Sequence, residues 1–159
     1  MSFSNNIIGR GFIAKNLVKI KRFIIKSGYI VYAAGISNSQ IKSKNQLHRE
    51  INVFRKFLKN YSSQKIIYIS TADVTNNLKN KSKYVQNKIT IEKLIKKNFN
   101  NYLIIRIPQI IGKSNNKKTL INFFYNMIKY NKKIKLFEGV FRNILDIDDM
   151  VKMIRVIIL

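Results

Sequence analysis

The sequence predicts an α/β fold in which a mainly parallel sheet is doubly wound, with helices on both faces. Apolar runs of strand length alternate along the chain with longer segments of helical periodicity, which is the pattern of βαβ units. Several of these runs are continuously apolar, as in strands buried on both faces. With 159 residues, 46% of them hydrophobic, the chain can form one compact core, and we expect residues 1–159 to be one domain.

The first expected unit is a strand, a glycine turn and a helix. Residues 6–8 are a short apolar run before the turn, and residues 13–26 repeat apolar side chains at helical spacing. Ser27 and Gly28 end this helix, and residues 29–35 form a continuous apolar run of strand length.

The same alternation continues to the end of the chain. Polar stretches at 37–45 and 76–83 are expected to be loops. The apolar spacing predicts helices over 46–60, 84–97, 120–130 and 147–158, and strands over 65–70, 102–107 and 134–137.

Composition excludes several classes of protein. Cysteine is absent and His48 is the only histidine, so disulfide frameworks and thiolate zinc sites are excluded and we expect no metal site. We expect His48, beside Arg49 and Glu50, to lie at the surface. The N-terminus does not resemble a secretory signal, and no apolar run reaches the roughly 18 residues that span a bilayer. These patterns predict a cytoplasmic protein without a membrane partner.

The net charge of +24 raises the question of nucleic-acid binding. The basic residues are mostly Lys and are spread from Lys15 to Lys152, whereas phosphate-reading surfaces favour clustered Arg. We therefore interpret the charge as a solvated basic surface and expect no specific nucleic-acid partner.

Gly9, Gly11 and Ala14 fit the pattern G-x-G-x-x-A between the first strand and the first helix. The first glycine permits a tight turn, the second lets backbone approach a pyrophosphate, and the small third residue allows close packing of helix and strand. The helix N-terminus would then face the anion with free N–H groups. The position favours a dinucleotide site, although a glycine turn that only begins a helix would look similar.

Two further strand ends have suitable residues for a site. Ala33, Ala34 and Gly35 close one strand with small side chains that would leave room for a cofactor, and Ser70 and Thr71 end the next strand with hydroxyl groups. In open α/β sheets, ligands bind at the carboxyl edge where such strand ends meet. Ordinary turns and strand ends also use these residue types.

Tyr84 and Lys88 lie one helical turn apart on one face of an expected helix. A nearby ammonium favours the phenolate, so Lys88 is expected to lower the pKa of Tyr84 and make it a usable general acid/base. Tyr61 with Lys65 and Tyr125 with Lys129 share the spacing. Only Tyr84 lies on the helix that follows the Ser70–Thr71 strand end, so only this pair is expected to face a hydroxyl group.

In this order, together with Arg106-Ile107-Pro108 and the segment 142–149, these motifs resemble the extended short-chain dehydrogenase/reductase family over nearly the whole chain. That family includes sugar-nucleotide epimerases, dehydratases and 4-keto reductases. The resemblance implies a Rossmann-like fold and an NAD(P)-dependent enzyme that acts on a nucleotide sugar, with a role in surface-polysaccharide biosynthesis. It also allows a homodimer.

The resemblance also implies roles for individual residues. Thr71, Tyr84 and Lys88 would be catalytic, with Thr71 bonding the reacting oxygen and Lys88 holding the nicotinamide ribose. Thr71 and Arg142 would bind substrate, and Asp149 would open a helix. The residues implied in binding NAD or NADP are Gly9, Gly11, Phe12, Ile13, Ala34, Gly35, Ser70, Tyr84, Lys88 and Pro108.

The chain departs from the family pattern in three places. A strand that ends in an acidic residue, with a further helix and strand, usually precedes the Ala-Ala/Gly turn. Here no acidic residue occurs before Glu50, so nothing selects NAD over NADP. The loop from Thr71 to Tyr84 is short, and a full substrate-binding subdomain is lacking. A non-catalytic dinucleotide-binding or scaffold protein is therefore the main alternative, and a basic nucleic-acid-binding protein is a third. The sugar, the nucleotide and the reaction subtype stay open.

Overall fold

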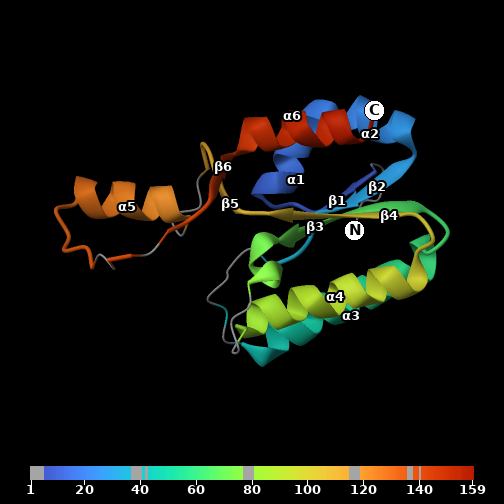
Figure 1. The fold of residues 1–159 in the computed structure, drawn as a ribbon, viewed down its shortest axis with the longest axis horizontal. Helices are drawn as coiled ribbons and strands as arrows, with labels where there is room; N and C mark the ends of the chain where they lie inside the picture. Colours follow the sequence, from blue (N-terminus) through green and yellow to red (C-terminus); the bar gives the residue numbers. More distant parts are fainter. Residues whose placement is uncertain are drawn as a thin grey trace.

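A computed structural model describes residues 6–36, 41, 43–76, 81–114, 119–135, 138–139 and 141–159. Four parallel strands form the central sheet in the order β1-β2-β3-β4 (Figure 1). The longest pairing joins β3 and β4 from Ile66–Tyr102 to Thr71–Ile107. The four strands are β1 (Ile7–Ile8), β2 (Tyr29–Tyr32), β3 (Lys65–Thr71) and β4 (Tyr102–Ile107).

Helices cover both faces of this sheet, as the predicted fold class requires. Their bounds agree with the sequence pattern to within a few residues, but residues 12–27 form two short α-helices joined by a 3₁₀ turn. The helical elements are α1 (Phe12–Leu17), η1 (Val18–Ile20), α2 (Lys21–Ser27), α3 (Lys44–Tyr61), η2 (Ala72–Thr75), α4 (Lys83–Asn98), α5 (Leu120–Lys129) and α6 (Ile147–Ile157).

The two faces of the sheet bury separate cores. On one face, Val31 and Ile67 pack against α1, α2 and α6; on the other, Tyr32 and Tyr68 pack against α3 and α4. Figure 1 shows these helices as two layers with the sheet between them. Neighbouring residues of β2 and β3 thus face opposite cores, which is why these strands are apolar without interruption. The Rossmann-like α/β class is confirmed.

The three connections between the strands of the main sheet do not all have the same hand. The strands follow chain order, so all three connections step across the sheet in one direction. The first runs through α1 and α2 on one face, and the next two run through α3 and α4 on the other. Connections on opposite faces that step the same way have opposite hands. Since about 98% of such crossovers are right-handed, at least one of these three has the rare hand.

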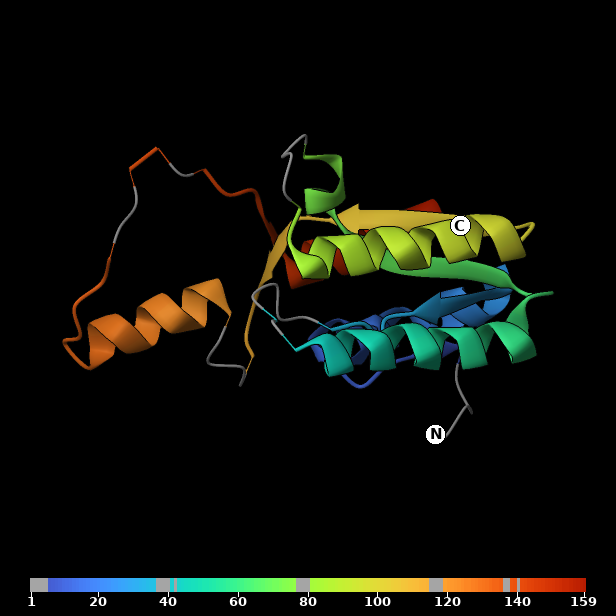
Figure 2. The same ribbon diagram turned by 90° about the horizontal axis from the view of Figure 1, so that it is seen from below.

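A smaller parallel pair lies beyond the main sheet. It consists of β5 (Gln109–Ile111) and β6 (Ile144–Asp146), neither of which was expected from the sequence. The predicted strand over 134–137 is wrong for residues 134 and 135, which have no regular structure, and its remainder lies outside the described residues. In the sequence α5 lies between β5 and β6; in space it extends away from the sheet, and it has no buried residue (Figures 1 and 2). No described helix is long and apolar enough to cross a membrane.

Local sequence explains several helix boundaries. Gly28, with φ +74°, ends α2 in the left-handed conformation that glycine adopts without strain. Ser43, Ser82 and Asp146 cap α3, α4 and α6 by accepting backbone N–H groups. The cap of α6 is therefore Asp146, and Asp149 lies in the first turn of this helix, as the resemblance implied.

Asp148 and Asp149 lie in the first turn of α6 and form ion pairs. Asp148 pairs with Lys19 and Asp149 with Lys152, and negative charge in a first helical turn is favourable. His48 is exposed, as expected.

Candidate active site

The glycine turn after β1 contains two glycines with different roles: the fold requires glycine at Gly9 but not at Gly11. Gly9 has φ +144°, and a Cβ there would lie 2.5 Å from the carbonyl oxygen of Ala33. Packing between β1 and β2 therefore requires this glycine. Gly11 is exposed, and a Cβ added to it would meet nothing within 4 Å. The fold leaves room above Gly11, as a close approach by a ligand would demand.

The start of α1 adjoins this open position. Gly11 is its N-cap and offers no side-chain hydrogen bond, so the first N–H groups of α1 have no side-chain cap. Phe12 and Ile13, both half-buried, form the first turn. Because α1 and α3 leave β1 and β2 toward opposite faces, this edge has the local arrangement at which open α/β sheets bind ligands. In most such folds this arrangement occurs where the strand order reverses. Here the strands follow chain order, and the arrangement results from connections of different hand.

Thr71 and Tyr84 meet at the carboxyl end of β3. Thr71 is the last residue of β3, and Ser82 starts α4 so that Tyr84 lies in its first turn. The Thr71 hydroxyl is hydrogen-bonded to the Tyr84 phenol. It also accepts the backbone N–H of Asp73 at 3.3 Å. The two hydroxyl groups proposed for one reaction thus lie together, as their order in the sequence suggested.

The pKa of Tyr84 does not follow the expectation from Lys88. It is raised to about 12, mainly by burial, with further contributions from the negative charges of Glu50 and Asp73. The hydrogen bond with Thr71 opposes this rise but does not cancel it. The predicted lowering is therefore wrong, because burial and two carboxylates raise the pKa of Tyr84, and one of these carboxylates is the partner of Lys88.

Lys88 forms a buried ion pair with Glu50 of α3. Its Nζ lies 3.1 Å from Glu50 Oε1, and both side chains are only 4% exposed. The same Nζ lies 5.5 Å from the ring centroid of Tyr84 and 5.6 Å from that of Tyr68. Lys88 is thus beside Tyr84, but its charge is balanced by a carboxylate that the sequence analysis did not place in the site.

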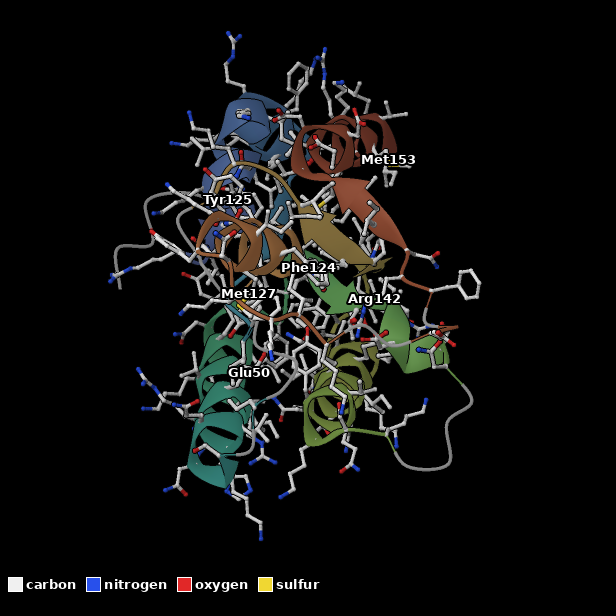
Figure 3. The ribbon with its side chains drawn as sticks, turned by 90° about the vertical axis from the view of Figure 1, so that its left-hand side faces the viewer. Glu50, Phe124, Tyr125, Met127, Arg142 and Met153 are labelled. Atoms are coloured by element: carbon white, nitrogen blue, oxygen red, sulfur yellow. The ribbon has the colours of Figure 1, made fainter. Side chains whose placement is uncertain are left out.

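Glu50 is held by three donors from two segments, α4 and the turn after β2. Besides Lys88, it accepts Asn87 Nδ2 at 2.6 Å and the backbone N–H of Ile36 at 3.2 Å. It therefore ties the turn after β2 to α4, and Figure 3 shows its place on α3. A signal for this role existed in the sequence, because Glu50 shares the buried face of α3 with Leu47, Phe54 and Phe57. An acid on such a face requires a partner.

The turn after β2 is filled differently from what was expected. A Cβ at Gly35 would lie 2.3 Å from Lys88 Nζ and 2.8 Å from Glu50 Oε1. The small residue therefore makes room for this ion pair, and not only for a cofactor. Ala34, the neighbouring predicted contact, is exposed.

Ser70 belongs to a second buried network on α4. Its hydroxyl donates to Glu92 Oε1 at 2.6 Å, and Arg106 donates to both oxygens of Glu92 at 3.1 and 2.7 Å. Burial alone would raise the pKa of Glu92, but these hydrogen bonds outweigh it and hold the pKa below its ordinary value. The Ser70 hydroxyl is thereby engaged, which leaves its backbone for any contact with a cofactor.

Replacing Arg106 with Met is expected to reverse the effect of pH on this network. A depressed carboxyl pKa contributes stability above the unfolded-state pKa and loses it as pH falls. Without Arg106, burial raises the pKa of Glu92, so this contribution is instead lost as pH rises. The melting temperature at pH 7 minus that at pH 4 should fall clearly relative to wild type. An unchanged difference would show that Arg106 does not control Glu92.

The remaining predicted residues lie around this edge. Pro108 is half-buried between β4 and β5. Arg142 is exposed on the segment that leads from α5 to β6 (Figure 3). The described contacts do not join Arg142 to Thr71, Tyr84 or Lys88, so its role in binding substrate stays a prediction.

This sheet and site define a Rossmann-like α/β protein. No family model and no curated protein matches the sequence. Among solved structures, the chain is similar to dTDP-4-dehydrorhamnose reductase from Bacillus anthracis str. Ames, determined in complex with NADP. The TM-score is 0.67 and the identity 18%, over 92% of this chain and 56% of that one. It is also similar to the capsular polysaccharide assembling protein CapF from Staphylococcus aureus, with a TM-score of 0.60 and 20% identity, over 96% of this chain and 50% of that one.

These similarities establish the fold. The chain spans about half the length of each of the two solved structures.

Proposed function

We propose that this chain binds NAD or NADP and belongs to an NAD(P)-dependent reductase or epimerase-like enzyme for a nucleotide sugar, in polysaccharide biosynthesis. The observation that supports this most is the meeting of Thr71 and Tyr84 at the carboxyl end of β3, beside Lys88. A hydroxyl donor next to a phenol is what proton transfer to a carbonyl oxygen requires. The names of the two similar proteins agree with this class of reaction and pathway.

The residues at the glycine turn fit a dinucleotide. The open position at Gly11 would accept the pyrophosphate against the first turn of α1. A bound nicotinamide would supply or accept the hydride. Thr71 would orient the sugar oxygen and Tyr84 would exchange its proton, while Lys88, held by Glu50, would face the nicotinamide ribose beside Gly35.

Calorimetric titration with NAD⁺, NADH, NADP⁺ and NADPH tests this proposal. We expect saturable binding of at least one dinucleotide and, with it, measurable reduction of dTDP-4-dehydrorhamnose or another 4-keto nucleotide sugar. No binding of any of the four would contradict the cofactor assignment. Comparing the four affinities would also show whether the protein prefers NAD or NADP, which the residues before Glu50 do not indicate.

A non-catalytic binding protein is the second candidate. It is favoured by Lys88, whose side chain is only 4% exposed and is paired with Glu50. Dinucleotide binding without turnover on any nucleotide sugar of the panel would support this reading over the enzymatic one.

A third reading, a dedicated nucleic-acid-binding protein, has only the net charge of +24 in its favour. Tight and sequence-selective binding of DNA or RNA near physiological salt would favour it.

A further inference from the structure

The Glu50–Lys88 ion pair joins α3 and α4, and neighbouring groups hold both of its side chains in place. Asn87 and the backbone of Ile36 hold the Glu50 carboxylate, and Lys88 lies against the Cα of Gly35. With 4% exposure on each side chain, neither group can turn toward solvent without breaking the pair. Lys88 is therefore held as a neutralised ion next to Tyr84.

Charged and polar groups surround Tyr84 from each element packed against it. The carboxylates of Glu50 on α3 and Asp73 on η2 act on it by charge, and Thr71 on β3 by a hydrogen bond. The ammonium of Lys88 lies beside its ring on the same helix. A negative charge on Tyr84 would also raise the pKa of the buried Tyr68 on β3. Two carboxylates thus act on the phenol, and the ammonium of Lys88 beside it is already paired with Glu50.

The consequence for proton transfer follows from the pKa of Tyr84, which is about 12. At pH 7 such a phenol is almost entirely protonated, with about one molecule in 10⁵ as phenolate. The protonated form can donate to a carbonyl oxygen. The phenolate, which would accept the proton of a substrate alcohol, is scarce.

We propose that Glu50 is a positioning residue that, by neutralising Lys88, keeps the Tyr84 phenol protonated, so that it can donate a proton to the carbonyl oxygen of a substrate up to high pH. The inference rests on the proposed function and adds the residue that sets the protonation state of its acid. The carbonyl carbon receives a hydride from the reduced nicotinamide, and the oxygen receives the Tyr84 proton. C=O becomes CH–OH, and water returns a proton to the phenolate.

A titration of the protein without cofactor tests the role of Glu50. Tyrosine labelled with ¹³C at Cζ gives one NMR signal per residue, and Tyr84→Phe identifies the signal of Tyr84. In wild type we expect this signal to titrate only around pH 12. In Glu50→Gln the apparent pKa of Tyr84 should fall by roughly one unit or more, because a carboxylate is lost and Lys88 is released. Titration of wild-type Tyr84 at or below the ordinary tyrosine pKa of about 10, or no change in Glu50→Gln, would overturn the proposal.

Two further variants separate this electrostatic role from a structural one. Glu92→Gln removes the other buried carboxylate of the region, which does not act on Tyr84, and should leave the Tyr84 signal unchanged. If Glu50→Gln does not fold, Glu50→Gln combined with Lys88→Met removes both charges, a replacement that is often tolerated. The apparent pKa of Tyr84 should be lower than in wild type in this double variant as well. A pKa equal to that of wild type would also overturn the proposal.

The pH dependence of turnover gives the second readout. With NADPH and dTDP-4-dehydrorhamnose, wild type should keep its reduction rate to high pH, whereas Glu50→Gln should lose it at a pH lower by the same shift. Identical alkaline limits would count against the proposal. The NMR titration needs no cofactor, so a protein that binds no dinucleotide would refute the proposed function without deciding the effect of Glu50 on Tyr84.

Discussion

Replacing Tyr84 with Phe is expected to lower the rate of carbonyl reduction by about two to four orders of magnitude, the usual contribution of a general acid. The phenol is half-buried and hydrogen-bonded to Thr71, so no solvent group can take its place at the same position. Phe keeps the ring and its contact with Lys88. Affinity for the dinucleotide should therefore change little, and the loss should appear in kcat measured by NADPH oxidation.

Tyr125→Phe is the matched control. Tyr125 has the same spacing to Lys129 and lies 5.8 Å from it, ring centroid to Nζ, but it is exposed on α5. Its removal should leave kcat nearly unchanged. Equal activity of wild type and Tyr84→Phe would remove Tyr84 from the mechanism.

Lys88→Ala is a less informative variant than the sequence suggested. We expected it to affect both cofactor binding and turnover, since Lys88 would serve the ribose and Tyr84 together. In the structure it would also leave Glu50 buried without its partner, and breaking such a pair costs about 3–5 kcal/mol. A loss of activity in this variant would thus include a loss of folded protein.

Replacing Gly11 with Val is expected to abolish dinucleotide binding while the protein stays folded. The new side chain would fill the open position next to the first turn of α1, where a pyrophosphate would need contact with the backbone. The φ of Gly11 is −77°, which valine adopts, and loss of glycine at a helix N-cap costs about 1 kcal/mol or less. Calorimetry for binding and thermal melting for stability measure the two effects separately.

Gly9→Val provides the contrast. Its Cβ would overlap the backbone of Ala33, and its φ of +144° strains any other residue. Gly9→Val should therefore lower the stability of the fold, whereas Gly11→Val should abolish dinucleotide binding in a folded protein. Unchanged affinity in a folded Gly11→Val protein would contradict the location of the cofactor.

Much of the fold followed from the sequence because the apolar pattern is strong. The strand at 65–71 is buried along a continuous run and the helix at 83–98 along a stripe, and the strand at 102–107 is a nearly continuous apolar run. Such patterns leave little choice of structure. The pair β5 and β6 was missed because three-residue strands have too few side chains to show a period. The strand expected at 134–135 rested on an equally short apolar run.

The site was only partly predictable for a different reason. The order of Thr71 and Tyr84 along the chain was enough to bring them together at one sheet edge. The pKa of Tyr84 was not predictable from its own helix, because it depends on burial in the folded protein and on Glu50, which lies more than thirty positions earlier in the sequence. The face of the sheet that α1 covers, and hence the hand of the first connection, likewise depends on packing against α6 at the other end of the chain.

Mapping a bound dinucleotide onto the backbone tests the central claim most directly. In ¹H–¹⁵N NMR spectra, addition of NADPH or NADH should shift the amides of Gly9–Ile13, Ala34–Gly35 and Thr71, with Tyr84–Lys88 affected next. Amides of α5 and of the outer face of α3 should stay in place. Shifts that are spread over the lysine-rich surface and vanish with added salt, with the glycine turn unaffected, would contradict the account.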